Sequence, residues 1–332
     1  MIDLKEIKTD LENNIEKLKS KGCEVDIKEV ISLQEKNNST QTSVDELKQE
    51  KNNLSKRIGQ ESANGSDVNK LKAEAENINK KIDSEVDRFN SLQSKFSELV
   101  AQIPNLPDDD VPRGDSEDHN IVLDEVIYRK EEGLDHVEIG NKLGLLDFDL
   151  ANKISGSRYV VLKGKLAQLQ RALIQFMLDH AEANGYSEYY VPLIVNSESL
   201  FGTGQLPKFE EDQFSVGQDK YLIPTAEVPL TNFIRDKVLD GDELPLKLCA
   251  HTPCFRSEAG SYGKDTKGMI RQHQFEKVEI VQIVHPENSE KVLDELVTNA
   301  KSLLDHLELS YRTVNLCSGD LGFSAAKTID IE

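Results

Sequence analysis

The sequence predicts an α+β protein with a helical N-terminal domain followed by a domain built on a mostly antiparallel sheet. Three features support this prediction: heptads upstream of residue 103, a proline-containing acidic stretch just after it, and strand-like runs alternating with helices further on. The length of 332 residues fits two domains. We therefore expect a helical domain over 1–103, a linker over 104–120 and a second domain over 121–332.

The N-terminal domain is predicted to contain two long helices. Apolar residues recur at alternating steps of three and four over 68–103, and the same spacing recurs more loosely over 30–58. Such heptads predict helices packed along one seam. A turn signal at 64–66 makes the two helices antiparallel, with Asp67 capping the second. An amphipathic helix over 1–22 comes first, and about 35 residues per helix would give an arm of about 50 Å.

Heptads also fit a dimerisation coiled coil, but here the hairpin fills the seam within one chain. The chain has a formal net charge of −20, of which residues 27–103 carry only −1 and residues 104–332 carry −17. The acidic body should repel DNA, whereas the arm could meet phosphate. The basic residues of the arm include Lys48, Lys51, Lys56, Arg57, Lys70, Lys72, Lys80, Lys81, Arg88 and Lys95.

The second domain is predicted to alternate helices with strands. Consecutive strand pairs with few crossover helices favour antiparallel pairing. Asn184-Gly185 closes the first helix as a C-cap signal. The expected helices are 167–184 and 289–307, and the expected strands are 186–195, 221–223, 246–255, 274–283 and 311–316.

Cysteine usage favours a reducing compartment, the cytoplasm. The four cysteines are too few and too scattered for a disulfide framework. Cys249-x-His251-x-x-Cys254 offers only three candidate ligands at irregular spacing, which does not favour zinc. The N-terminus is charged from the start, unlike a signal peptide, and no apolar run reaches the roughly 18 residues of a membrane span.

The stretch 255–279 contains the residues best suited to chemistry. Arg256 offers a fork for phosphate or carboxylate, and Glu258, expected on the same strand face, could accept from an exocyclic amine. On the return strand Arg271, Phe275 and Glu279 should share one face, where an aromatic ring could stack a base. From the residues alone, a solvated hairpin with cross-strand ion pairs fits such a charged stretch better.

The pattern Phe255-Arg256-x-Glu258, a loop and Arg271-x-x-x-Phe275 resembles motif 2 of class II aminoacyl-tRNA synthetases. With Pro224-Thr225-Ala226-Glu227 and the antiparallel arm, essentially all 332 residues resemble bacterial-type seryl-tRNA synthetases. The segment 185–195 resembles motif 1, the dimer-interface element. Three further stretches resemble that family: 153–159, 202–209 and 315–327.

This resemblance implies a serine–tRNA ligase that forms seryl-adenylate from serine and ATP with Mg²⁺, and implies a role for each matching residue. Arg256 and Arg271 would be the catalytic residues. Arg256, Glu258, Arg271 and Phe275 would bind ATP. Thr225, Glu227, Arg256 and Glu279 would bind serine. Lys48, Lys51, Lys56, Arg57, Lys70, Lys72, Lys80 and Lys81 would bind tRNA.

The resemblance further implies a homodimer through motif 1 and binding to tRNA(Ser), with tRNA(Sec) left open. The motif 2 loop, with Lys264 and Lys267, would meet the acceptor end of the tRNA. We find no third class II motif before Glu332. The expectation is therefore a fragment with impaired adenylation, whose magnesium ligands lie largely beyond residue 332. Two alternatives remain: a relative that loads an amino acid onto a carrier protein, and a non-catalytic RNA-binding coiled-coil protein.

Overall fold

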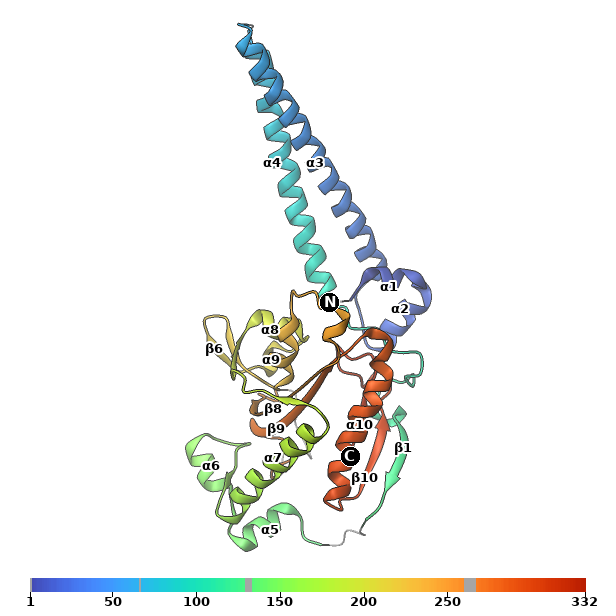
Figure 1. The fold of residues 1–332 in the computed structure, drawn as a ribbon, viewed down its shortest axis with the longest axis vertical. Helices are drawn as coiled ribbons and strands as arrows, with labels where there is room; N and C mark the ends of the chain where they lie inside the picture. Colours follow the sequence, from blue (N-terminus) through green and yellow to red (C-terminus); the bar gives the residue numbers. More distant parts are fainter. Residues whose placement is uncertain (1, 66, 129–132, 260–266) are drawn as a thin grey trace. The chain divides into compact units, whose positions relative to one another are not determined.

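A computed structural model describes residues 2–65, 67–128, 133–259 and 267–332 (Figure 1). The chain divides into two compact units. The first comprises Met1–Glu117 and Ser318–Ala326, and the second comprises Asp118–Cys317 and Lys327–Glu332. Within the described ranges, no helix has both the length and the apolar character that crossing a membrane requires.

The first unit consists of two short helices and a long two-helix arm, in which the antiparallel pair lies side by side (Figure 1). The predicted helix over 1–22 is in fact two helices that meet at Asp10. The Asp10 backbone leaves the helical region, at φ −143° and ψ 76°, and its carbonyl accepts from Asn14 as the next helix begins. The helices are α1 (Leu4–Thr9), α2 (Leu11–Ser20), α3 (Ile27–Ala63) and α4 (Asn69–Val100).

The heptad pattern places apolar side chains along the seam of the arm, as predicted. Val30, Val44 and Leu54 of α3 are buried, as is Ile78 of α4. Asp67 accepts from the Asn69 backbone at 2.9 Å, one position before the N-cap residue of α4. The two-helix coiled coil is therefore confirmed, although the N-cap residue of α4 is Val68 and not the expected Asp67.

A buried lysine joins the two chain segments of the first unit. Lys21 is 8% exposed, and its ammonium donates to the carbonyls of Asn105 at 3.1 Å, Phe323 at 3.0 Å and Ala325 at 2.5 Å. The Asn105 amide in turn donates to the Phe323 carbonyl at 3.0 Å. Burial of an ammonium is tolerated when its donors are satisfied. Residues 318–326 are thus anchored on the helical unit.

Among its described residues, the second unit forms four small sheets, in which every strand pair is antiparallel except β4 with β8. The sheet orders are β1-β10-β11, β2-β3, β4-β8-β9 and β5-β7-β6. The strands are β1 (Ile121–Val126), β2 (Leu146–Asp147), β3 (Val161–Leu162), β4 (Ser187–Glu188), β5 (Ile194–Asn196), β6 (Ser215–Gly217), β7 (Lys220–Leu222), β8 (Leu246–Phe255), β9 (Gln274–Ile283), β10 (Tyr311–Asn315) and β11 (Ile329–Ile331).

Helices of the second unit pack against these sheets and fix the position of the hairpin β8–β9. Ala226 and Leu230, in and just before α9, share a buried cluster with Leu248 and Ala250 of β8. The α-helices are α5 (His136–Leu143), α6 (Phe148–Ile154), α7 (Lys165–Ala183), α8 (Ser197–Gly202), α9 (Glu227–Thr231) and α10 (Ser289–His306). Short 3₁₀ helices lie at Glu117–His119, Glu210–Asp212, Asn232–Ile234, Gly241–Glu243 and Pro286–Asn288.

One difference from the predicted elements lies at 186–195. Only β4 and β5 form there, with Pro192 in the unpaired stretch between them. Proline lacks the N–H that a ladder position needs, so a continuous strand is interrupted. The predicted bounds of β8 and β9 agree with the structure.

Candidate active site

Two strands and one turn of the second unit bring most of the predicted site residues together. Phe275 and Glu279 lie on β9, two positions on either side of Lys277, so all three side chains leave the same face. The guanidinium carbon of Arg256, just past the end of β8, lies 5.2 Å from the centre of the Phe275 ring. A cation and an aromatic ring are thus adjacent at this point of the site.

The turn before α9 is tied directly to β9. The Thr225 hydroxyl donates to the Glu279 carboxylate at 2.5 Å and accepts from the Glu227 backbone at 3.1 Å. Arg256 Nε donates to the Pro224 carbonyl at 3.4 Å. Thr225 is buried, and its hydroxyl joins the first residue of α9 to the Glu279 carboxylate of β9. Its role in binding serine stays a prediction.

Lys277 completes this group, although sequence reasoning gave it no role. Its ammonium lies 2.9 Å from the Thr225 hydroxyl oxygen and 2.8 Å from the Glu279 carboxylate. The side chain of Lys277 is 31% exposed and that of Glu279 is 20% exposed. The alternation of β9 indicated the shared face. The contact with Thr225 crosses between elements, and no local pattern reports it.

Glu227 is the fourth predicted pocket residue and remains accessible to solvent. The surrounding protein atoms partly desolvate its carboxyl group, and the neighbouring Glu279 adds repulsion, so the pKa of Glu227 is raised. Lys277 and Arg256 oppose this effect without cancelling it. Glu227 thus keeps its proton to a higher pH than an ordinary glutamate does.

Glu258 lies at the opposite end of the site, paired with Arg271. The Arg271 guanidinium lies 3.2 Å from the Glu258 carboxylate. Strand alternation was expected to orient Glu258, but β8 ends at Phe255 and Glu258 has a φ of +52°. Its side chain is therefore aimed by a turn rather than by the strand. Arg158, which sequence reasoning did not single out, donates to the Glu258 carbonyl at 3.0 Å.

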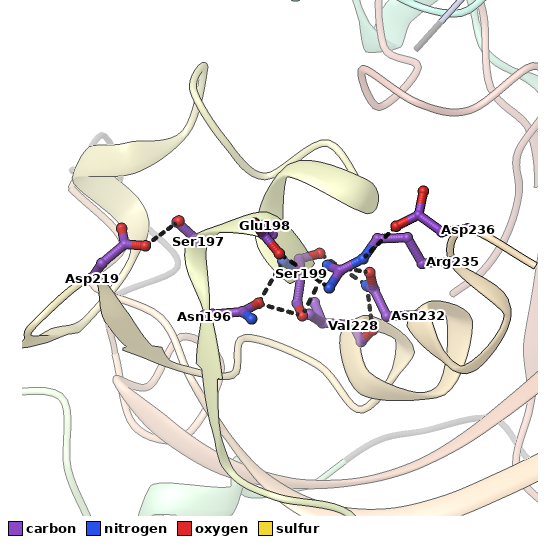
Figure 2. Close-up of polar contacts among 9 residues, drawn as sticks. All are labelled: Asn196, Ser197, Glu198, Ser199, Asp219, Val228, Asn232, Arg235 and Asp236. Carbon is purple, nitrogen blue, oxygen red and sulfur yellow. Dashed lines mark hydrogen bonds and ion pairs between the residues drawn. The ribbon is translucent and has the colours of Figure 1, made fainter.

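A polar cluster outside the pocket holds α9 against α8 (Figure 2). The Asn232 amide donates to the carbonyls of Ser199 at 2.9 Å and Val228 at 2.8 Å. Its oxygen accepts from Arg235 at 3.0 Å. A Cβ atom on Gly202 would lie 2.8 Å from that same oxygen. Gly202, in the stretch 202–209, thus permits close packing against Asn232.

The return side of the motif 2 loop contacts α5. Lys267 pairs with Asp135 at 2.5 Å, and the Met269 amide donates to His136 Nε2 at 3.0 Å. The hydrogen bond and charge of that pair raise the pKa of Lys267. Lys264 lies outside the described residues.

All eight basic residues predicted to bind tRNA lie exposed on the arm. They belong to the first unit, so they are not part of the site on β8 and β9. Their ion pairing is sparse among the described contacts, where Lys80 lies 4.0 Å from Glu76.

Neither zinc nor magnesium has an evident site in the described ranges. Within them no group of three or more His, Cys, Asp or Glu side chains could hold a metal ion. Burial raises the pKa of both Cys249 and Cys254, which disfavours the thiolates that zinc needs. Mg²⁺ commonly takes only one or two protein carboxylates together with phosphate oxygens, and we assign no residue of these ranges to it.

Comparison with known proteins gives matches along the chain. Residues 1–107 match the family described as seryl-tRNA synthetase N-terminal domain, and residues 208–332 match the tRNA synthetase class II core domain (G, H, P, S and T). Serine–tRNA ligases from Hydrogenovibrio crunogenus and Cellvibrio japonicus are 49% and 50% identical. These alignments cover 100% of this chain and 80% and 79% of the relatives.

A solved structure is similar over the same extent. The seryl-tRNA synthetase from Pyrococcus horikoshii, crystallised as a complex with ATP, superposes with a TM-score of 0.89 at 32% sequence identity. The match covers 100% of this chain and 80% of that chain.

Proposed function

The chain belongs to the seryl-tRNA synthetase family of ATP-dependent ligases, and we propose that the hairpin β8–β9 and the turn before α9 carry the reaction. In the first step, a serine carboxylate oxygen attacks the α-phosphorus of ATP and pyrophosphate leaves. In the second, a ribose hydroxyl of the terminal adenosine of tRNA attacks the seryl carbonyl carbon and AMP leaves. Both steps depend on positioning and on neutralising phosphate charge.

The observation that best supports this assignment is the position of Arg256. Its guanidinium lies over Phe275 and bonds to the backbone of the turn that carries Thr225. A planar fork there can hold the α-phosphate and the serine carboxylate together. Attack would then occur between two groups bound by one side chain, while Phe275 stacks the adenine ring.

Glu258 and Arg271 bind the two ends of ATP. Glu258 accepts from the exocyclic amine of adenine, and Arg271 holds the outer phosphates. Their mutual ion pair at 3.2 Å keeps both side chains ordered until nucleotide binds. Magnesium would add charge neutralisation on the phosphates, and its ligands remain a prediction without assigned residues.

Serine binds among Thr225, Glu227 and Glu279. Carboxylate and hydroxyl oxygens accept from its α-ammonium and from its hydroxyl. Alanine lacks that hydroxyl and would leave polar groups of the pocket unpaired, so the pocket rejects it. The tie between Thr225 and Glu279 at 2.5 Å sets these acceptors in place before substrate arrives.

The arm binds tRNA(Ser) through its exposed basic side chains. The arm has a net charge of only −1, whereas residues 104–332 carry −17, so phosphate is repelled least there. Transfer to tRNA(Sec) remains open.

A homodimer forms around the motif 1 region. Leu169 of α7 is 52% exposed, Ile194 is 48% exposed and Tyr190 is fully exposed, which leaves apolar side chains for a partner to cover. The four cysteines are reduced thiols, which supports a reducing compartment such as the cytoplasm.

Serine-dependent ATP–pyrophosphate exchange tests the first step, and charging of tRNA(Ser) tests the second. Whatever the rate of exchange, we expect it to depend on serine, with little signal from alanine or threonine. Exchange with another amino acid and none with serine would overturn the assignment. Seryl transfer to a carrier protein but not to tRNA would favour the carrier-protein ligase, and RNA binding without any exchange would favour a non-catalytic protein.

A further inference from the structure

The Lys277 ammonium lies where an ammonium of the substrate is expected. It contacts the Thr225 hydroxyl at 2.9 Å and the Glu279 carboxylate at 2.8 Å, two of the acceptors assigned to the amino acid. The Thr225 hydroxyl also donates to Glu279 and accepts from the Glu227 backbone. Both lone pairs and the proton of the Thr225 hydroxyl are therefore engaged. A second ammonium cannot donate to this hydroxyl while Lys277 does.

We propose that Lys277 acts as an internal stand-in for the α-ammonium of serine, and that serine must displace it from Thr225 and Glu279. The proposal rests on the proposed function of this pocket. A lysine ammonium and an α-ammonium are chemically alike, each with three donors and one positive charge. Two such cations at one pair of acceptors would repel each other, so the two groups bind in exchange.

The displaced side chain keeps an acidic neighbour. The charge of Lys277 acts on the Glu227 carboxyl as well as on Glu279, so both acids lie within its electrostatic reach. Lys277 has a long flexible stem and is partly exposed, which lets its ammonium leave Thr225 without leaving the site. Displacement therefore needs a side-chain rotation, with the backbone of β9 unmoved.

This exchange makes Lys277 a specificity-determining residue. A simple amine gains nothing by replacing one ammonium with another at the same acceptors. A full amino acid also brings a carboxylate for Arg256, and that extra contact drives the exchange. The pocket would thus discriminate against amines without a carboxylate, a property that Thr225 and Glu279 alone would not give it.

The test compares serine with ethanolamine, which keeps the ammonium and the hydroxyl but lacks the carboxylate. Dissociation constants are measured by calorimetry for the wild type, for Lys277→Met and Lys277→Gln, and for Lys277→Arg, which keeps the charge. Lys220→Met, an exposed lysine of β7 away from these contacts, is the matched control. Circular dichroism establishes that each variant is folded. If Lys277→Met does not fold, Lys277→Gln takes its place in the comparison.

We expect loss of the charge at 277 to tighten ethanolamine binding at least tenfold and to reduce the preference for serine over ethanolamine. The arginine variant and the Lys220 control should resemble the wild type. Weaker serine binding with ethanolamine unchanged would overturn the proposal, because Lys277 would then contact the substrate carboxylate. Unchanged binding of both ligands would overturn it too. Failure of the wild type to bind serine would count against the proposed function, whereas the ethanolamine comparison reports on Lys277 independently.

Discussion

The Arg271 guanidinium and the Glu258 carboxylate lie 3.2 Å apart. We assign these residues to the outer phosphates and to the adenine amine of the same nucleotide. In the protein without nucleotide, the two groups assigned to the two ends of ATP therefore neutralise each other, and ATP must replace their ion pair with its own contacts.

Arg271→Ala should weaken ATP binding selectively. Hydrogen bonds to charged groups contribute about 1.5–3 kcal/mol, so the KM for ATP in pyrophosphate exchange should rise roughly 10- to 100-fold. The KM for serine should change by less than about twofold, since Arg271 pairs with Glu258 at the other end of the site. Arg271→Lys keeps the positive charge but lacks the two-pronged guanidinium. Its KM for ATP should lie between those of the wild type and of Arg271→Ala. An equal rise in both KM values would contradict the assignment.

Glu227→Gln should stabilise the unliganded protein at alkaline pH. The raised pKa means that the folded state holds this proton more tightly than the unfolded chain does. The stabilisation from Glu227 is therefore complete below its ordinary pKa and is lost as pH rises through the raised value. A neutral amide removes this loss, so the variant should melt about 1–2 °C above the wild type at pH 8, an increment kept small by solvent screening.

At pH 4 the two proteins should melt together, because Glu227 is then protonated in both states. Glu35→Gln, an exposed glutamate of α3, should give no such pH-dependent difference. A melting difference that is the same at pH 4 and pH 8 would show that packing, not ionisation, distinguishes the variant.

Gly202→Ala and Asn232→Ala should be strongly non-additive. The alanine Cβ at 202 would lie 2.8 Å from the Asn232 oxygen, an overlap that costs about 1–3 kcal/mol. Removing the Asn232 side chain loses its hydrogen bonds but also removes the clash. The double variant should therefore lose less thermal stability than the two single variants combined.

Gly241→Ala is the matched control, since a Cβ atom added there would meet no described atom within 4 Å.

Because Asn232 holds the helix that follows Thr225, the KM for serine should rise more than the KM for ATP in Asn232→Ala. Strict additivity of the two substitutions would refute the clash between residues 202 and 232 as the cause.

Charge reversal on the arm should weaken tRNA binding without affecting adenylation. Replacing Lys51, Lys56 and Lys72 together by Glu should raise the Kd for tRNA(Ser) at least about tenfold at low salt. The slope of log K against log salt should fall by about 0.7–0.9 for each phosphate that the variant no longer neutralises. Filter binding at several salt concentrations measures both the Kd and the slope. Pyrophosphate exchange shows whether the adenylation site is unaffected.

Lys36→Glu reverses another exposed charge of α3, outside the predicted set, and should leave the affinity near that of the wild type. An unchanged tRNA affinity in the triple variant would remove the arm from the recognition surface.

Long periodic segments were predictable from the sequence because many positions repeat the same signal. The arm has a heptad over dozens of residues, and β8 and β9 are ten-residue strands whose bounds agree with the structure. β1 was missed, since Ile121-Val-Leu123 shows no alternation and its pairing is supplied by β10, far along the chain. Asp10 divides a helix that the apolar pattern alone would continue.

Within the site, the sequence supplied the residue types but not their mutual contacts. Strand alternation is sufficient to place the side chains of Phe275 and Glu279 on the same face of β9. The bond from Lys277 to Thr225 joins residues 52 positions apart and depends on how α9 packs on β8. Glu258 reaches Arg271 through a left-handed backbone conformation that strand periodicity does not anticipate.

The three carbonyls around Lys21 have a consequence for dissecting this protein. Two of them belong to Phe323 and Ala325, whose segment lies between two strands of the other unit, β10 and β11. A single cut in the linker would therefore separate a helical fragment from the carbonyls that solvate its own buried ammonium. The arm and its base are one folding unit in space but two pieces in the gene, so a transplantable tRNA-binding module would have to include both.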